Sequence, residues 1–251
     1  MATVILTSDP GIFGSIIDEF AFEVSEFSDE ITVYESNKSN KLLMVAKNFD
    51  FTEGIEEISE VLLRYPIEFL ISLEHATAFS EDIAVGSVLL CDRMSSLEGP
   101  IALWHPNECS VIKKFVNQPI SHLFENLAHD NWIIPHCSLL ATSQIVAKPP
   151  MKKWLNKVLQ VDANDFHGKG IDSLSRKLNI EYVLVRGIVT AAEVKHSDFY
   201  IELQRNERSS LLLVIFNPFK LITLIKFIKR RSKMRKNVSK ILRRLLFVEA
   251  V

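Results

Sequence analysis

Residues 157–193 read KVLQVDANDFHGKGIDSLSRKLNIEYVLVRGIVTAAE, and their pattern is the clearest indication of the fold class. It holds two short runs rich in Val, Ile and Leu, residues 158–163 and 182–189, with a helical pattern over 170–178 between them. Short apolar runs bounded by polar turns are typical of strands that are buried on both faces. A strand, a helix and a strand in this order predict one unit of an α/β sheet.

The same alternation extends toward the N-terminus. Further strands are predicted at 4–7, 41–46, 69–73, 84–91 and 138–146, and further helices at 11–24, 53–65 and 117–128. No internal repeat or linker interrupts this pattern before about residue 205. We therefore expect one α/β domain over residues 1–208, followed by an apolar and then basic C-terminal segment over residues 209–251.

Composition narrows the class of protein. With 251 residues, 47% of them hydrophobic and 24% charged, the chain can bury a sizeable core. Its three cysteines are odd in number and widely spaced, which argues against a disulfide framework and for a reducing compartment. The N-terminal apolar run ends at Ser8-Asp9-Pro10 and no basic region precedes it, so it is not typical of a signal peptide. The expected location is the cytoplasm, at the periphery of a membrane if the C-terminal segment binds lipid.

No metal ion or cofactor is predicted. The histidines and cysteines lack the Cys-x₂-Cys and His-Glu-x-x-His spacings of zinc sites. Gly168-Lys169-Gly170 lacks the Walker spacing, and it is interpreted as a turn before a helix.

Three stretches resemble successive motifs of the nucleoside phosphorylase/nucleosidase superfamily, which includes purine and uridine phosphorylases and methylthioadenosine/adenosylhomocysteine nucleosidases. VILTSDP at 4–10 is similar to the strand that leads into the Pro-Gly-Asp-Pro-x-Arg phosphate loop. The second stretch, FLISLEHATAFSEDIAVGSVLL at 69–90, is similar to a strand of the family, the Gly-Ser-x-Gly turn after it and the next strand. The third stretch, 157–193, is similar to the family's Val-Glu-Met-Glu segment, the helix after it and the strand that ends in Arg-x-Ile-Ser-Asp. The resemblance implies a three-layer α/β/α sandwich with a central mixed sheet, cleavage of the N-glycosidic bond of a purine-type nucleoside, and a homo-oligomer.

The motif positions that would hold phosphate carry other side chains here. Ser8 stands at a glycine of the phosphate loop, and glycine is the residue that lets the backbone approach a phosphate closely. Ile12 stands at the arginine of that loop, so the paired charge-assisted hydrogen bonds from a guanidinium to the phosphate are lost. Leu73 and Glu74 fall in the Gly-Ser-x-Gly turn, where a carboxylate would repel an anion. Only eight glycines occur in the chain, although ligand-cradling turns depend on this residue. Phosphate binding is therefore not expected.

The side chains that would act on the sugar and the base are also replaced. Val161-Asp162-Ala163-Asn164 stands at the position of the Val-Glu-Met-Glu segment, and Asp165 lies one position after the place of the last glutamate in that motif. Thr190 stands at the family's general acid, and a threonine hydroxyl cannot supply the roughly 10²–10⁴-fold that such an acid contributes. By resemblance, the ligand cleft would be lined by Ser8, Asp9, Ile12, Leu73, Asp162, Asn164 and Thr190.

These replacements predict a non-catalytic relative that acts as a binding or scaffold protein. Two alternatives stay open. In one, the chain is an enzyme of the phosphorylase or nucleosidase type with relocated groups, for which the candidates are Asp162, Asp165, Glu74 and Glu193. In the other, it is a nucleoside sensor that keeps the pocket without the chemistry.

The C-terminal segment predicts a basic amphipathic helix. Residues 209–251 contain eleven Lys/Arg and one acid, Glu249, so the rest of this chain of net charge −2 is acidic. Basic residues recur every three or four positions, opposite an apolar side. The residues expected to bind a membrane or a partner are Lys226, Lys229, Arg230, Lys233, Lys236, Lys240, Arg243 and Arg244.

Four interpretations of this helix stay open. In the first, the helix docks on the acidic remainder of the chain, or its basic face is merely solvated. In the second, it binds an anionic membrane surface that the apolar run at 211–228 would enter. Alternatively it binds a protein partner, a second copy of the chain included, or nucleic acid. Nucleic acid is the least favoured, because the basic stripe lacks interleaved aromatic residues after Phe227 and the acidic body would repel phosphates.

Overall fold

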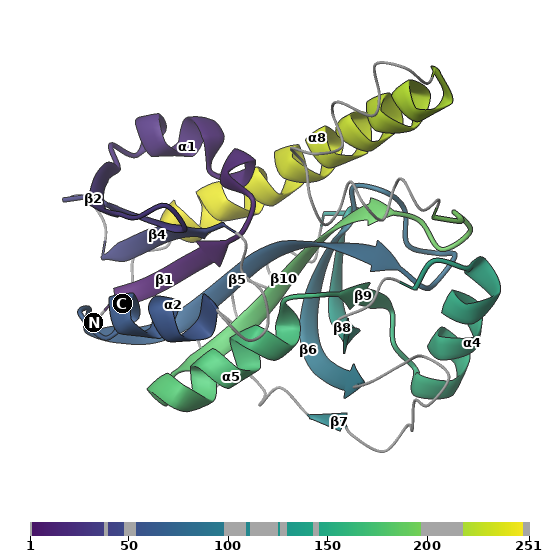
Figure 1. The fold of residues 1–251 in the computed structure, drawn as a ribbon, viewed down its shortest axis with the longest axis horizontal. Coiled ribbons are helices and arrows are strands. Elements are labelled where there is room, and N and C mark those ends of the chain that lie inside the picture. Colours follow the sequence, from purple (N-terminus) through teal and green to yellow (C-terminus); the bar gives the residue numbers. More distant parts are fainter. Residues whose placement is uncertain are drawn as a thin grey trace.

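The computed structural model describes residues 2–37, 40–47, 54–97, 109–110, 125, 130–142, 146–196 and 218–247. The strands are β1 Ala2–Thr7, β2 Glu23–Phe27, β3 Ile31–Glu35, β4 Lys41–Ala46, β5 Ile67–Ala78, β6 Val88–Leu97, β7 Cys109–Ser110, β8 Ile133–Thr142, β9 Ala163–Asp165 and β10 Glu181–Thr190. The helices are the 3₁₀ turn η1 Pro10–Ile12, α1 Gly14–Glu19, α2 Gly54–Leu62, α4 Pro149–Leu159, α5 Gly168–Leu178 and α8 Pro218–Phe247. Figure 1 shows a twisted sheet with helices around it.

The sheet is mixed and partly closed. Its order is β10-β6-β8-β9-β5-β1-β4-β3-β2, with β7 paired to β6. β1 is parallel to both β4 and β5, and β10 is parallel to β5, whereas β2 and β3 continue the sheet antiparallel. Because β10 pairs with both β5 and β6, the strands β5, β10, β6, β8 and β9 close into a ring.

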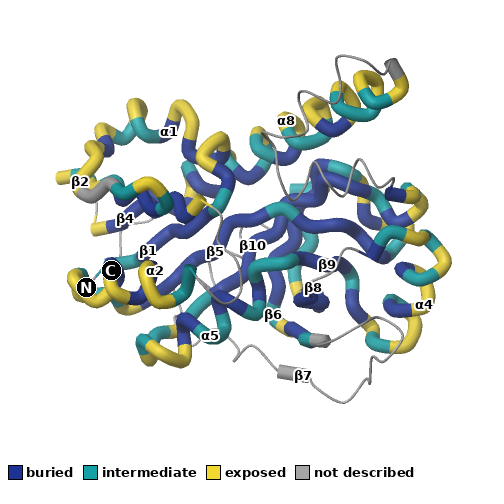
Figure 2. Tube along the Cα trace, in the orientation of Figure 1, coloured by how far each residue is buried: buried dark blue, intermediate teal, exposed yellow. Residues whose placement is uncertain are grey.

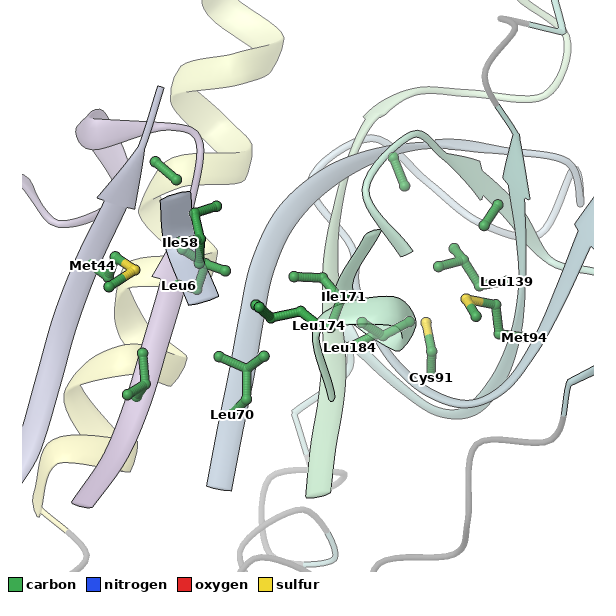
Figure 3. Packing of buried hydrophobic residues seen from close by; sticks show 14 of the residues in the cluster. Leu6, Met44, Ile58, Leu70, Cys91, Met94, Leu139, Ile171, Leu174 and Leu184 are labelled. Atoms are coloured by element: carbon green, nitrogen blue, oxygen red, sulfur yellow. The ribbon is translucent and has the colours of Figure 1, made fainter. Parts of the chain in front are cut away.

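The core has two layers, one on each face of the sheet. One cluster contains Leu70 and Leu184 of the strands, together with apolar residues of α2 and α5 such as Ile58 and Leu174 (Figure 3). The other cluster contains alternate residues of the same strands, such as Val185, and lies against α1 and α8. The central strands are buried along most of their length (Figure 2). The three-layer sandwich with a central mixed sheet is therefore confirmed.

The C-terminal helix α8 covers one face of the sheet. Its side chains Met234, Val238 and Ile241 are fully buried in the same cluster as Ile12 and the odd-numbered residues of β10. Gly187 allows this close approach, because a Cβ there would lie 2.3 Å from Met234 Cγ. Over its second half, α8 therefore docks on its own body, as one of the four sequence interpretations expects.

Some predicted elements differ from the structure. The strand predicted over 158–163 is misplaced: residues 158 and 159 end α4, the chain turns at Gln160 with a φ of 52°, and the strand β9 begins only at Ala163. Periodicity alone cannot separate a short buried strand from the last turn of a helix. The helix predicted over 11–24 is shorter, since β2 begins at Glu23. The helix predicted over 117–128 lies outside the described residues, apart from residue 125.

Packing of α8 on the sheet makes a prediction about stability. Replacing fully buried Ile241 by alanine removes apolar contacts and leaves a cavity, so we expect a loss of about 2–5 kcal/mol in the free energy of unfolding. Ile222→Ala, on the same helix but at a side chain that is 50% exposed, is the control and should change stability by less than about 0.5 kcal/mol. Urea unfolding of the three proteins measures both values. Equal stabilities would show that α8 does not belong to the core.

Candidate functional site

The candidate site lies at the carboxyl end of β1, beside the middle of the longer parallel strands β5 and β10. Carboxyl ends of parallel strands are where ligands bind in open α/β sheets. Polar side chains that are buried or nearly buried meet at this position. We call them the polar cluster, and they are Ser8, Ser72, Glu74, Asp165, His167 and Arg186.

Arg186 forms the centre of the polar cluster. Its Nε donates to Asp165 Oδ2, and its Nη1 donates to the backbone oxygen of Ser72 at 2.9 Å and to Ser72 Oγ at 3.2 Å. Both members of the ion pair are fully buried. The other carboxylate oxygen of Asp165 accepts from the backbone N–H of Gly168, at the first residue of α5, at 3.1 Å. The pair thus joins β10, β5, the end of β9 and the start of α5.

Glu74 forms the second half of the polar cluster. The backbone N–H of Ser8 donates to Glu74 Oε1, and Ser8 Oγ donates to Oε2 at 2.8 Å. His167 Nδ1 lies 3.8 Å from the same Oε2. Burial raises the pKa of the Glu74 carboxyl, while the electrostatic interactions with His75 and Arg186 and the hydrogen bonds from Ser8 act against this shift. A buried carboxyl with a raised pKa is the kind of group that can hold a proton.

His75 follows Glu74 on β5 and is a neutral imidazole near pH 7. Burial lowers its pKa to about 4, although the charge of Glu74 acts in the opposite direction. Its ring lies edge-on to that of His167, with 6.2 Å between the ring centroids. Two histidines and a carboxyl of raised pKa therefore lie together where the second half of β5 meets the start of α5.

Asp9 lies at the end of β1, in the position that resembles a phosphate loop. Its carboxylate is fully buried, and Arg235 donates to both of its oxygens, at 2.8 Å from Nε and 2.6 Å from Nη2. Arg231 Nε donates at 3.1 Å, and the backbone N–H of Gly11 donates at 3.1 Å. Burial opposes ionisation, but the two arginines outweigh it and hold the pKa of Asp9 below its ordinary value. A carboxylate of the chain itself thus neutralises the arginines at this loop.

The other residues predicted to line the cleft make structural contacts. Asp162 Oδ2 accepts from the backbone N–H of Ser138 at 2.8 Å. Asn164 Nδ2 donates to the backbone oxygen of Leu140 at 3.0 Å and to a threonine hydroxyl of β8 at 2.9 Å. Ile12 and Leu73 are packed in the core beneath α8, and Thr190 is fully buried at the end of β10. Of the four predicted catalytic candidates, the fold brings Glu74 and Asp165 into the polar cluster and leaves Asp162 and Glu193 outside it.

Glu193 instead lines a cavity of about 320 Å³ beyond the ends of β5 and β10. The cavity is lined by Phe79, Glu81, Pro149, Pro150, Lys153, Ala192 and Glu193. Its walls are mostly apolar, and its charged side chains come from three different segments. It is large enough for a small molecule or part of one.

The basic residues predicted to bind a membrane or a partner divide into two groups. Arg243 donates to Glu19 Oε2 at 2.8 Å, Arg244 lies 2.6 Å from Asp130, and the ammonium of Lys240 lies 5.4 Å from the ring centroid of Trp132. The remaining predicted residues lie on the exposed or half-buried side of α8, and they are Lys226, Lys229, Arg230, Lys233 and Lys236. Among the described residues, no group of three His, Cys, Asp or Glu could hold a metal ion, and none of the helices has an apolar stretch that could span a bilayer.

Sequence reasoning did not identify Arg186, His75 or His167 as site residues. One signal pointed to Arg186: it is a charged residue inside the apolar run of β10, and an arginine in a buried strand requires a buried partner. The histidines gave no such signal, because their proximity depends on how β5 lies against the start of α5.

Comparison with known proteins identifies the fold. No protein-family model and no curated protein sequence matches the chain. Among solved structures, it is similar to Streptococcus pyogenes S-adenosylhomocysteine nucleosidase, with a TM-score of 0.68, 12% identity and coverage of 98% of this chain and 96% of that one. It is also similar to Helicobacter pylori 5'-methylthioadenosine/S-adenosylhomocysteine nucleosidase, with a TM-score of 0.67, 13% identity and coverage of 97% and 96%. The third is futalosine hydrolase of Helicobacter pylori, with a TM-score of 0.67, 13% identity and coverage of 98% and 97%.

The resemblance noted in the sequence is therefore confirmed at the level of the fold. The chain has the fold of the nucleoside phosphorylase/nucleosidase superfamily over nearly its whole length. A fold at this level of identity does not carry a reaction with it, so function depends on the site itself.

The Arg186–Asp165 pair makes the first prediction for the site. Arg186→Met leaves the Asp165 carboxylate buried without its partner, so we expect a loss of about 3–5 kcal/mol in the free energy of unfolding. The double variant Arg186→Met with Asp165→Leu removes both charges and should recover part of that loss. Urea unfolding of both single variants and the double variant gives the coupling free energy. Additive losses would contradict a direct interaction between the two side chains.

Glu74 makes a prediction about pH. Because folding raises its pKa, the stability that Glu74 contributes is present below the ordinary pKa of about 4.5 and is lost as pH rises through the folded-state value. A glutamine side chain does not ionise, so the free energy of unfolding of the Glu74→Gln variant relative to the native chain should increase from pH 4.5 to pH 8. Glu60→Gln, at an exposed position on α2, should show no such trend. A difference that shrinks with rising pH would contradict the raised pKa.

Proposed function

We propose that this chain is a binding or scaffold protein built on the nucleoside phosphorylase/nucleosidase fold, and that it does not cleave nucleosides. The polar cluster carries this proposal, because its side chains bond to one another. Glu74 accepts two hydrogen bonds from Ser8, and Arg186 is paired with Asp165 and Ser72. Groups committed in this way must break buried hydrogen bonds before they contact a substrate, and each bond lost costs about 1–3 kcal/mol.

The residues that resemble the catalytic motifs support the same proposal. Thr190, at the position of the general acid, has a hydroxyl that is fully buried. Ile12, at the position of a phosphate-loop arginine, packs beneath α8, and the neighbouring Asp9 carboxylate takes two arginines of that helix. Both a phosphorolytic and a hydrolytic reaction would therefore lack their main groups at these positions.

The proposal predicts no release of base from nucleosides. The purified chain is incubated with 5'-methylthioadenosine, with S-adenosylhomocysteine and with unmodified purine nucleosides, each with and without phosphate, and chromatography measures free base. We expect no release above that of buffer alone. Turnover that falls at least tenfold in Glu74→Gln or Glu193→Gln, but not in the exposed control Glu60→Gln, would establish an enzyme with relocated groups instead.

A nucleoside sensor is the second candidate, and two observations favour it. Arg186 Nη2 and His75 Nδ1 are buried polar atoms without a hydrogen-bond partner among the described residues, although such atoms are nearly always paired in folded proteins. The cavity lined by Phe79 and Glu193 also lies beyond the ends of the same strands. Calorimetric titration with 5'-methylthioadenosine separates the two candidates. Saturable binding that is lost in Phe79→Ala and Glu193→Ala supports the sensor, and no heat of binding supports the scaffold.

A further inference from the structure

The first turns of α8 expose an apolar surface that the fold does not bury. Leu221, Ile225 and Ile228 are 45%, 44% and 54% exposed, and Phe219 is 80% exposed. Spacings of four and three residues place the three aliphatic side chains on one side of the helix. In Figure 1 this end of α8 extends past the sheet, away from the other labelled elements. We call these four residues the apolar end.

A row of exposed lysines runs along the solvent side of the same helix. Lys226, Lys229, Lys233, Lys236 and Lys240 recur at alternating intervals of three and four residues, and each is exposed. This spacing keeps them on one side of a helix with 3.6 residues per turn. We call them the lysine stripe, and its first members lie beside the apolar end.

The division between lysines and arginines shows which charges the fold already uses. Four of the five arginines of α8 form ion pairs with the rest of the chain: Arg231 and Arg235 with Asp9, Arg243 with Glu19, and Arg244 with Asp130. No ion pair of the lysine stripe with a carboxylate occurs among the described residues, and residues 218–247 contain no Asp or Glu. Carboxylates from the rest of the chain therefore pair with the charges on one side of α8, and the outer side of the helix stays positive.

We infer that the lysine stripe and the apolar end dock this protein on an anionic lipid surface, with α8 lying along the surface. Lysines near such a surface are attracted to its headgroups, and neighbouring apolar side chains enter the boundary between headgroups and acyl chains. A second copy of the chain would present the same positive stripe and be repelled. An acidic protein or a nucleic acid would engage the lysines but would leave the apolar end in water. The inference does not depend on whether the chain cleaves nucleosides.

Vesicle co-sedimentation of the full chain tests this inference. We expect pelleting with vesicles of phosphatidylcholine mixed with phosphatidylserine, weaker pelleting with phosphatidylcholine alone, and release as salt is raised. Reversing three charges in Lys226→Glu, Lys229→Glu and Lys233→Glu should lower the partition coefficient by about a hundredfold. Replacing three aliphatic side chains in Leu221→Ser, Ile225→Ser and Ile228→Ser should lower it by about tenfold or more.

Matched variants elsewhere on the chain serve as controls. Lys148→Glu, Lys157→Glu and Lys195→Glu change the net charge equally at exposed positions outside α8, and Val24→Ser, Leu63→Ser and Val158→Ser replace three exposed apolar side chains. Both control variants should pellet like the native chain. Equal pelleting of the native chain and the stripe variant overturns the inference. The inference is also overturned if the variant with Leu221→Ser, Ile225→Ser and Ile228→Ser pellets like the native chain and the native chain binds a duplex oligonucleotide through the lysine stripe as strongly as it binds the vesicles.

Discussion

The guanidinium of Arg186 lies inside a closed ring of strands, and the structure around it keeps this charge paired. Moving an unpaired charge out of water costs several kcal/mol, so a fully buried arginine is compatible with folding only if a carboxylate and further acceptors reach it. Asp165 supplies the carboxylate and Ser72 supplies two acceptors. These residues come from different strands, so satisfying one charge fixes the ring closure, the end of β9 and the start of α5 together.

This requirement has a consequence for function. In an open α/β sheet, the ends of parallel strands are free to contact a ligand, because loops there need no bonds with one another. Here, beside the end of β1, an ion pair and a carboxyl that accepts from Ser8 are bonded to other side chains of the same chain. The neighbouring carboxylates also differ: burial raises the pKa of Glu74, while two arginines hold that of Asp9 down. A fold shared with nucleosidases thus carries, near the end of β1, one carboxyl of raised pKa and one of lowered pKa.

Helix α8 connects this arrangement to the surface. Its inner side is apolar and includes Met234, which packs where Gly187 leaves room, and its arginines reach the carboxylates of the body. Its outer side is left with lysines and with exposed aliphatic side chains at the first turns. One helix therefore has a structural side and an exposed side, and four of its five arginines belong to the structural side. Arginine suits paired sites because its planar fork binds a carboxylate with two hydrogen bonds, as Arg235 does with Asp9.

The sequence alone predicted the alternating strands and helices, including β4 and β10 with nearly their observed bounds, a helix in the C-terminal segment and the likeness of the fold to the superfamily. Local periodicity is enough to predict these elements, because each buried run or helical face involves only about ten consecutive residues. Only the tertiary structure decided that residues 149–159 form α4, that Glu74 meets Ser8, and that Asp9 meets two arginines of α8. Those contacts join residues 66 to 226 positions apart. Their geometry depends on strand register and helix docking, which no local pattern specifies.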